Sequence, residues 1–240
     1  MKKLIMSAVI WALTAGLSLA GSHSVIRMGT EGAYPPWNYV DDNGEVAGFE
    51  RELGDELCKR AELNCEWVIN DWDSIIPNLV SGNYDTIIAG MSITDERQEK
   101  IDFTSNYTQP DPSSYVAASE GADLSGGIIA AQSNTIQAAY IAGTGATLVE
   151  FATPEETISA VRNGEADAVL ADTSYLNPIV AEDSGLMFAG DKVLIGGGVG
   201  MGIRKSDADL RDKFTAAINS MKADGTLNAL IVKHEIGETF

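Results

Sequence analysis

Residues 81–90, Ser-Gly-Asn-Tyr-Asp-Thr-Ile-Ile-Ala-Gly, have a counterpart 82 positions later in residues 163–172, Asn-Gly-Glu-Ala-Asp-Ala-Val-Leu-Ala-Asp. Each stretch contains the end of a predicted helix, a glycine, two variable residues, an aspartate and an apolar strand. A proline-rich break at 110–112 separates the two copies, so we expect two similar lobes. Because ligands bind outside the carboxyl ends of strands in open α/β sheets, Gly90 and Asp172 are candidate ligand-site positions at equivalent strand ends.

Strands and helices alternate on both sides of this repeat. The first half of the pattern predicts strand 25–29, helix 49–60, strand 66–69, helix 74–80 and strand 84–89. The second half predicts strands 115–118, 127–131, 147–151 and 166–171, a helix from the capping box 153–156 to Gly164, and a late helix over 210–221 that Gly225 ends. Alternating βα units with apolar strands indicate an α/β fold, with parallel sheets covered by helices on both faces.

The composition is that of an acidic, well-folded chain. Of its 240 residues 45% are hydrophobic, which excludes a disordered chain. Asp and Glu number 35 against 16 Lys and Arg, which gives a formal net charge of −19. That balance argues against non-specific binding to nucleic acid or anionic lipid, because both need positive surface.

The sequence lacks the residues that several kinds of catalytic and cofactor site require. The two histidines, His23 and His234, lie near opposite ends of the chain, which argues against a Ser-His-Asp triad or a histidine-based metal site. No Walker loop is present, and the glycine run over 196–202 fits neither dinucleotide nor phosphate-loop spacing. We expect that run to be a backbone crossing or a site of tight packing.

The first twenty residues have the layout of a secretory signal. A short basic region, Met1–Lys3, precedes a mostly apolar run over 4–19, and Ser18 and Ala20 place small residues at −3 and −1 of a cut before Gly21. The alternative is a membrane anchor, but the run of 16 residues is shorter than the ~20 that span a bilayer. We therefore expect residues 1–20 to be removed on export.

Export also makes a disulfide possible, because compartments outside the cytoplasm are oxidising. Cys58 and Cys65 lie at the end of one predicted element and the start of the next. They could be two buried thiols, but export and an even cysteine count favour a bridge that fastens a helix end to a strand.

One arginine and two aromatic residues follow predicted strands. Thr94 is a natural N-cap, which places Arg97 in the first turn of a short helix. From spacing alone, Arg97 is either a surface arginine paired to a neighbouring glutamate or a fork that binds an anion. Tyr34 and Trp72 follow the first and second strands, where two aromatics can flank a ligand, although each taken singly more often packs in a core. Two further tryptophans, at 37 and 67, are assigned to packing.

Five short motifs occur in a distinctive order over residues 25–105. They are Gly29–Pro36, Gly48–Glu50, Asp73–Pro77, Ser92–Arg97 and Asp102–Thr104. This order resembles the polar amino-acid-binding proteins of bacterial ABC transporters, the periplasmic family that includes the lysine/arginine/ornithine, histidine and glutamine binders. Asp224-Gly225-Thr226 matches a late turn of that family, and the two cysteines lie where its basic-amino-acid binders carry a disulfide.

The resemblance implies a two-lobed periplasmic binding protein fold. Each lobe would be a mostly parallel sheet flanked by helices, and two crossing strands would join the lobes. The implied division assigns 21–110 and 194–240 to the first lobe and 111–193 to the second. Ligand would bind between the lobes, which close by hinge motion.

Carried over by position, the resemblance also implies how an amino-acid head group is bound. Arg97 would clamp the α-carboxylate, helped by the Ser92 backbone N–H and by N–H groups at the helix start of Thr135. The Gly90 carbonyl, the Ser92 hydroxyl and the Asp172 carboxylate would bind the α-ammonium. Splitting these partners between lobes would mean that only the closed protein satisfies the ligand.

The implied side-chain site contains Tyr34, Trp72 and Glu31, and Met91 is a further expected ligand-binding residue. Tyr34 and Trp72 would flank the ligand, and Glu31 stands where basic-residue binders place an acid near the distal cation. We therefore expect arginine, lysine, ornithine or a related cationic derivative. Ala89-Gly90 replaces the Ser-Ser pair of lysine/arginine binders and resembles the glutamine binder, so another polar amino acid is the alternative.

The resemblance implies a function without a cofactor or metal. The chain would be the periplasmic solute-binding subunit of an ABC importer, a monomer that delivers an amino acid to a membrane permease and binds no nucleic acid. The same scaffold also resembles periplasmic cyclohexadienyl dehydratases, for which Glu31 would be the acid of an elimination. A third alternative is a soluble sensor module that feeds a receptor.

Overall fold

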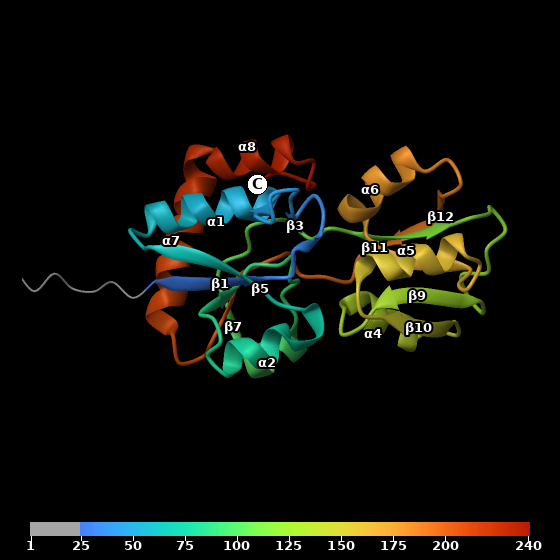
Figure 1. Ribbon diagram of the computed structural model, residues 1–240, viewed down its shortest axis with the longest axis horizontal. Coiled ribbons are helices and arrows are strands. Elements are labelled where there is room, and N and C mark those ends of the chain that lie inside the picture. The colour runs from blue at the N-terminus through green and yellow to red at the C-terminus, as the bar shows by residue number, and fades with distance from the viewer. Residues whose placement is uncertain (1–24) are drawn as a thin grey trace, which may run out of the picture.

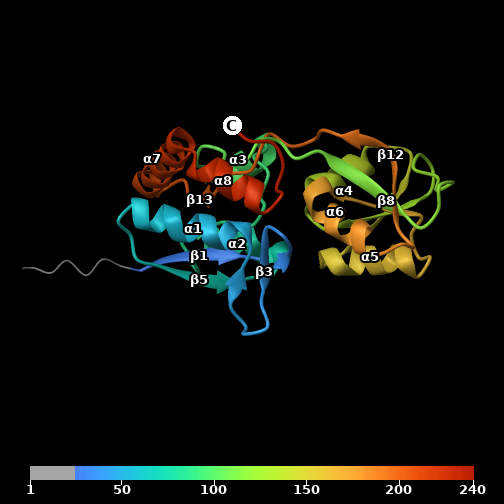
Figure 2. The same ribbon diagram turned by 90° about the horizontal axis from the view of Figure 1, so that it is seen from above.

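The structure is a computed structural model that describes residues 25–240. Its helices and strands form two lobes that lie side by side and are joined by two extended segments of backbone (Figure 1). The expected signal, residues 1–20, lies outside the described residues. In the view from above, both connecting segments run along one side of the molecule (Figure 2).

The first lobe contains the N-terminal and C-terminal parts of the described chain. Its main sheet has the strand order β5 (Cys65–Ile69), β1 (Ile26–Thr30), β6 (Thr86–Ile87), β13 (Gly202–Ile203) and β7 (Asp102–Phe103). A small antiparallel sheet is formed by β2 (Ala33–Tyr34), β3 (Asn38–Val40) and β4 (Val46–Ala47). Its helices are α1 (Phe49–Arg60), the 3-10 turn η1 (Trp72–Ser74), α2 (Ile75–Val80), α3 (Asp95–Lys100), α7 (Ala208–Asp224) and α8 (Thr226–Lys233).

The second lobe is one continuous stretch of chain. Its sheet has the order β10 (Thr147–Phe151), β9 (Ile128–Gln132), β11 (Ala168–Asp172), β8 (Ser113–Ala117) and β12 (Met187–Val193). Its helices are α4 (Ile136–Ala142), α5 (Pro154–Arg162) and α6 (Thr173–Glu182). Thr153 and Glu156 form the predicted capping box at the start of α5, which ends at Arg162, two residues before the predicted end.

Both sheets are mostly parallel, as the sequence predicts. In the first, β5, β1 and β6 pair in parallel, and only β13 runs against its neighbours. In the second, β10, β9 and β11 pair in parallel, and only β8 runs against its neighbours. The two reversed strands are the first strands that the chain enters after each crossing between lobes. The βα pattern does not predict that reversal.

Helices cover both faces of each sheet, which buries the apolar strands. On one face of the first sheet, Leu53 of α1 and Phe214 of α7 pack with Met28 of β1, all fully buried. On its other face α2 packs with β6. In the second lobe α5 and α6 cover one face and α4 the other. Burial of apolar surface on both faces is the main favourable contribution to the stability of such a fold.

The predicted disulfide between Cys58 and Cys65 is present and links the end of α1 to the start of β5. The predicted strand over 84–89 is shorter than expected, because only Thr86 and Ile87 pair with neighbouring strands. Ile88 still donates its N–H to Gly29, after which the backbone turns at Gly90, where φ is 60°. The strand therefore ends just before this turn.

The glycine run packs tightly, as predicted. Val199 bridges to both Ser92 and Thr108, so the two crossing segments are hydrogen-bonded to each other. A methyl group on Gly198 would lie 2.9 Å from the Thr108 carbonyl oxygen, and one on Gly197 would lie 3.0 Å from that of Ile93. Larger side chains would push the crossing segments apart, which explains the glycines.

The internal repeat has a structural explanation in its two aspartates. Asp85 accepts a hydrogen bond from the backbone N–H of Arg27 at 3.0 Å, and its own N–H donates to the Arg27 carbonyl at 2.8 Å. Asp167 makes the same reciprocal pair with Ile128, at 2.7 and 2.8 Å. Each aspartate therefore fixes the start of the first parallel strand of its lobe, β1 or β9.

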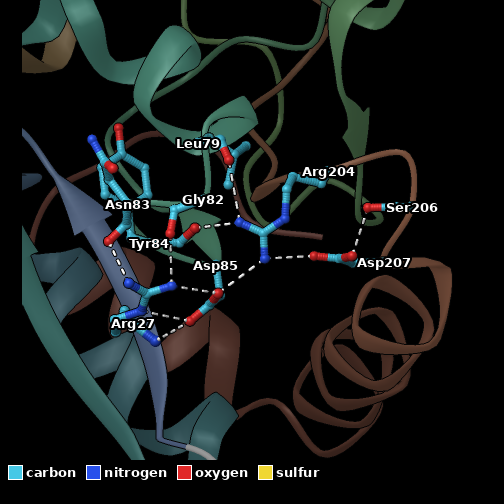
Figure 3. Close-up of polar contacts among 9 residues, drawn as sticks. All are labelled: Arg27, Leu79, Gly82, Asn83, Tyr84, Asp85, Arg204, Ser206 and Asp207. Carbon is cyan, nitrogen blue, oxygen red and sulfur yellow. Dashed lines mark hydrogen bonds and ion pairs between the residues drawn. The ribbon is translucent and has the colours of Figure 1, made fainter.

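Asp85 is also the centre of a charged cluster (Figure 3). It pairs with Arg27 at 3.0 Å and with Arg204 at 2.9 Å, and the Arg204 guanidinium continues to Asp207 at 2.6 Å. Burial alone would raise the pKa of Asp85, but hydrogen bonds from the two arginines outweigh it and lower that pKa to about 2. The cluster therefore stabilises the folded lobe while Asp85 is ionised.

Among residues 25–240, no helix has both the length and the apolar character needed to cross a bilayer. Within the same range, no group of three or more His, Cys, Asp or Glu side chains is placed to hold a metal ion.

We predict that Asp85→Asn lowers the free energy of unfolding by about 1–2 kcal/mol near pH 7, because ionised Asp85 binds two arginines. The pKa of Asp85 is lower in the folded than in the unfolded chain. Its contribution is therefore complete above about pH 4 and is lost as the pH falls toward 2. Urea denaturation of wild type and variant at several pH values measures this, and the two curves should converge in acid.

Asp55→Asn is the control, because Asp55 forms an exposed ion pair with Arg51 at 2.8 Å. Such pairs contribute less than about 1 kcal/mol. Equal stability losses for Asp85→Asn and Asp55→Asn, or a difference between wild type and Asp85→Asn that does not change with pH, would contradict the assignment.

Candidate functional site

A cavity lies between the two lobes and is lined by residues of both. Both strand ends singled out by the repeat line it, Gly90 after β6 and Asp172 at the end of β11. The cavity is therefore placed where the carboxyl edges of two α/β sheets face each other. Its lining comprises Glu31, Tyr34, Trp72, Ala89, Gly90, Ser92, Arg97, Gln132, Thr135, Ile136, Gln137 and Asp172.

Local structure fixes Arg97 in the part of the cavity wall that the first lobe forms. Thr94 caps α3 by accepting a hydrogen bond from the Arg97 N–H at 3.2 Å, as the sequence predicts. The guanidinium turns back and donates to the Ser92 carbonyl at 2.8 Å, and it lies over the Trp72 ring at 5.3 Å. The guanidinium also donates to the Asn134 carbonyl of the second lobe at 3.3 Å, so the side chain is held by its own loop, an aromatic face and the opposite lobe.

Arg97 is a buried cation without a protein counter-ion. It is only 9% exposed, and no carboxylate within residues 25–240 forms an ion pair with it. This excludes the surface arginine that spacing alone left open. Burial lowers the pKa of Arg97 to about 10, so the group remains charged at neutral pH. A buried cation without a partner is costly, and a bound anion would remove that cost.

Asp172 is the matching carboxylate on the second lobe and is partly buried. It accepts hydrogen bonds from the Tyr34 hydroxyl at 3.0 Å and the Gln137 amide at 2.7 Å. Burial and the nearby charge of Asp111 raise the pKa of Asp172, whereas the two hydrogen bonds and Arg97 act in the opposite direction. A cation bound beside Asp172 would favour its ionised form.

Glu31 supplies a second carboxylate at another part of the cavity wall. Gln132 of the second lobe donates to it at 2.6 Å and also to the Ala152 carbonyl at 3.0 Å. Burial raises the pKa of Glu31 to about 7, with the acidic residues Asp71 and Asp73 adding to the shift. A positively charged ligand group at this position would therefore be favourable.

Thr135 stands at the start of α4, as predicted. Its hydroxyl oxygen accepts from the Ala138 N–H at 3.2 Å and the hydroxyl donates to the Gln132 carbonyl at 2.6 Å. The first turn of α4 thus presents Ile136 and Gln137 to the cavity alongside Thr135.

The lobes also contact each other directly around the cavity. Trp37 of the first lobe donates its indole N–H to the Ser174 hydroxyl at 2.7 Å, and both side chains are buried. Tyr34 stacks on Tyr175 with ring centroids 4.3 Å apart. The Asn134 amide of the second lobe donates to a carboxylate of the first lobe's rim, Asp73, at 3.1 Å. The lobes are therefore closed on each other.

Trp37 does more than the packing predicted for it. It packs against Phe49 edge-to-face, with ring centroids 5.7 Å apart. Its indole N–H, however, donates a hydrogen bond to Ser174 of the other lobe. Trp67, also assigned to packing, keeps its indole N–H within the first lobe, on Asp55.

Eight of the nine predicted site residues line the cavity, and Met91 does not. The Met91 side chain is fully buried in an apolar core cluster of the first lobe. Sequence reasoning missed Ala89, Gln132, Ile136 and Gln137 as lining residues. Ala89 could have been found from its place beside Gly90, and Ile136 and Gln137 from their place directly after Thr135, whereas no sequence signal marks Gln132.

The arrangement suits a small molecule that carries both charges. One wall has a cation, Arg97, and the opposite wall has a carboxylate, Asp172. A second carboxylate, Glu31, and the aromatic faces of Tyr34 and Trp72 complete the lining. These groups are recognition groups: each can hold a charge or an apolar stem in place.

Comparison with known proteins gives the same picture over the whole described chain. The profile of the bacterial extracellular solute-binding proteins, family 3, matches residues 26–237. The lysine/arginine/ornithine-binding periplasmic protein of Escherichia coli is 33% identical over 256 aligned positions, which cover 98% of this chain and 97% of that protein. The L-arginine-binding protein of Pseudomonas aeruginosa is 31% identical and covers 94% and 93%.

A solved structure is more similar still. A periplasmic His/Glu/Gln/Arg/opine family-binding protein from Silicibacter pomeroyi, crystallised in complex with lysine, is 76% identical. The match covers 88% of this chain and 96% of that one, with a TM-score of 0.86.

We predict that Trp37→Phe shifts the ligand-free protein toward an open arrangement of the lobes. Phenylalanine keeps the apolar packing on Phe49 but cannot donate to Ser174. Loss of one buried hydrogen bond, about 1 kcal/mol, changes an open–closed ratio roughly fivefold. Small-angle X-ray scattering should show a larger radius of gyration without ligand.

Trp67→Phe is the matched control, because it removes an indole N–H that stays within one lobe. The two variants should differ in their scattering. If Trp37→Phe scatters like wild type, or if Trp67→Phe opens the protein equally, the contact with Ser174 does not contribute to closure.

Proposed function

Because this chain belongs to family 3 of the bacterial extracellular solute-binding proteins, we propose that its cavity captures a cationic amino acid, arginine, lysine, ornithine or a close derivative, for delivery to the membrane permease of an ABC importer. The observation that carries the proposal is the pair of oppositely charged groups that line one cavity from opposite lobes, the buried Arg97 and the partly buried Asp172.

The head group of an amino acid fits that pair. Its carboxylate would bind the Arg97 guanidinium and the backbone N–H groups near Ser92 and Thr135, and its ammonium would bind Asp172 and the Gly90 carbonyl. Each buried charge then gains the counter-ion that it lacks in the ligand-free protein. Burying either ligand charge without a partner would cost several kcal/mol, so a site of this kind needs both.

Glu31 supports a cationic side chain on the ligand. Its carboxylate lines the cavity apart from the head-group pair, and Gln132 orients it from the opposite lobe. Tyr34 and Trp72 would enclose the apolar stem between head group and distal charge. The similar structure from Silicibacter pomeroyi was solved with lysine, and the relatives from Escherichia coli and Pseudomonas aeruginosa are named for lysine, arginine and ornithine.

Closure of the lobes would complete the function. The ligand bridges groups of both lobes, so it stabilises the closed form by its differential affinity for that form. A permease can then distinguish loaded from empty protein by shape. Delivery from the periplasm requires export, which agrees with the signal predicted over residues 1–20. The relatives are binding proteins, which favours capture over the dehydratase alternative.

We predict that Arg97→Ala and Asp172→Ala each weaken lysine binding by about 100-fold or more, because each leaves one ligand charge buried and unpaired. Arg97→Ala removes a costly buried charge from the ligand-free protein, so its melting temperature should stay the same or rise. Isothermal titration calorimetry and thermal denaturation measure the two effects.

Arg204→Ala is the control, for which we expect the opposite effects on lysine affinity and melting temperature. Arg204 binds Asp85 outside the cavity, so its loss should lower the melting temperature and leave lysine affinity intact. Unchanged affinity in Arg97→Ala or Asp172→Ala would mean that the ligand binds elsewhere.

Glu31→Gln tests the ligand class. We predict that it weakens binding of lysine and arginine by roughly tenfold or more, because the distal cation loses its carboxylate, while glutamine binding changes less. Calorimetric titrations with the three amino acids give the ratio. Asp73→Asn, at an exposed carboxylate on the cavity rim, controls for general charge. An equal loss for glutamine and lysine in Glu31→Gln would show that Glu31 does not recognise a cation.

A further inference from the structure

Glu50 is a fully buried carboxylate that lies outside the cavity, near the start of α1. It accepts three hydrogen bonds, from the Gly90 backbone N–H at 2.7 Å, from the Asn38 amide at 2.7 Å and from the Tyr107 hydroxyl. A buried carboxylate is weak support for stability, since desolvation opposes the gain from its contacts. Its three partners, however, lead to three separate parts of the ligand site.

The first partner is part of the cavity wall. Gly90 lines the cavity and has a left-handed backbone, with φ at 60°. The hydrogen bond from its N–H to Glu50 fixes the orientation of the peptide that enters this turn. The position of the Gly90 carbonyl, the proposed acceptor for the ligand ammonium, therefore depends on Glu50.

The second partner, Asn38, connects Glu50 to the loop that carries Glu31 and Tyr34. The Asn38 amide nitrogen donates to Glu50, and its amide oxygen accepts from the Gly32 N–H at 2.8 Å. Gly32 directly follows Glu31 and lies two residues before Tyr34. Asn38 thus links the buried carboxylate to the loop that carries the cation-binding acid and one aromatic wall.

The third partner belongs to the crossing between lobes. Tyr107 is fully buried, and its backbone N–H donates to the Val199 carbonyl at 2.7 Å, across the two connecting segments. The carboxylate of Glu50 therefore joins the floor of the cavity, the Glu31 loop and the hinge at one point.

We propose that Glu50 is a positioning residue for ligand binding: it touches no ligand, but holds the Gly90 acceptor and the Glu31–Tyr34 loop in register with the hinge. This inference rests on the proposed function, because it concerns the affinity of the same site.

The test is Glu50→Gln in the full chain. Glutamine has the same size as glutamate but presents an N–H₂ group to partners that are themselves donors. At least one of the three hydrogen bonds to this side chain is therefore lost. Lysine affinity by calorimetry should fall roughly tenfold or more, as for loss of a hydrogen bond to a charged group. In the ligand-free protein, hydrogen exchange of the Gly90 and Gly32 amides, followed by NMR, should become faster. Folded Glu50→Gln that binds lysine like wild type would overturn the proposal.

Tyr107→Phe and Tyr84→Phe form a matched pair that decides the question even if Glu50→Gln does not fold. Both remove a buried tyrosine hydroxyl from the first lobe, but the Tyr84 hydroxyl donates to the Ile75 carbonyl instead of Glu50. At equal loss of melting temperature, only Tyr107→Phe should weaken lysine binding. Equal affinity in the two variants would overturn the proposal.

A separate result would concern the proposed function alone. If wild type binds none of the cationic amino acids, that function fails, whereas faster exchange at Gly90 in Glu50→Gln would still support the positioning of the cavity wall by Glu50.

Discussion

Two opposite charges, a buried guanidinium on one lobe and a partly buried carboxylate on the other, are the feature on which the rest of this structure depends. The Arg97 guanidinium and the Asp172 carboxylate line one cavity, and no ion pair between them is present within residues 25–240. Each group has hydrogen-bond partners but no counter-ion. The proposed zwitterionic ligand would supply both counter-ions, which is the physical basis of the affinity that we expect.

The rest of the fold places Arg97 and Asp172 on opposite walls of the cavity. Each lobe is a layered unit in which an aspartate, Asp85 or Asp167, fixes the start of β1 or β9. The connecting segments are hydrogen-bonded to each other at Val199, so the lobes are joined by a narrow, double-stranded hinge. Contacts such as that of Trp37 with Ser174 add closing energy that does not depend on ligand.

Much of this could be predicted from the sequence, because it depends on local rules. The repeat placed Gly90 and Asp172 at equivalent strand ends, and both line the cavity. Capping signals located α3 and α5, and paired cysteines indicated the disulfide. Arg97 could not be resolved from spacing, since its neighbours Glu96 and Glu99 are equally good partners for a surface arginine; only its burial excludes that alternative.

The features that could not be predicted depend on contacts between distant segments. Gln132 faces Glu31 only because the lobes close, and the sequence around Gln132 carries no signal of that pairing. The same holds for Trp37, whose apolar surroundings predict packing and hide its bond to Ser174. The reversed strands β8 and β13 follow from how the chain re-enters each sheet, which a count of βα units does not contain.

The most direct measurement is a crystal structure of the protein with lysine bound. The account predicts the lysine α-carboxylate within hydrogen-bond distance of the Arg97 guanidinium, the α-ammonium beside Asp172, and the distal ammonium toward Glu31. A lysine with its head group away from Arg97 and Asp172, or one bound outside the space between the lobes, would contradict it.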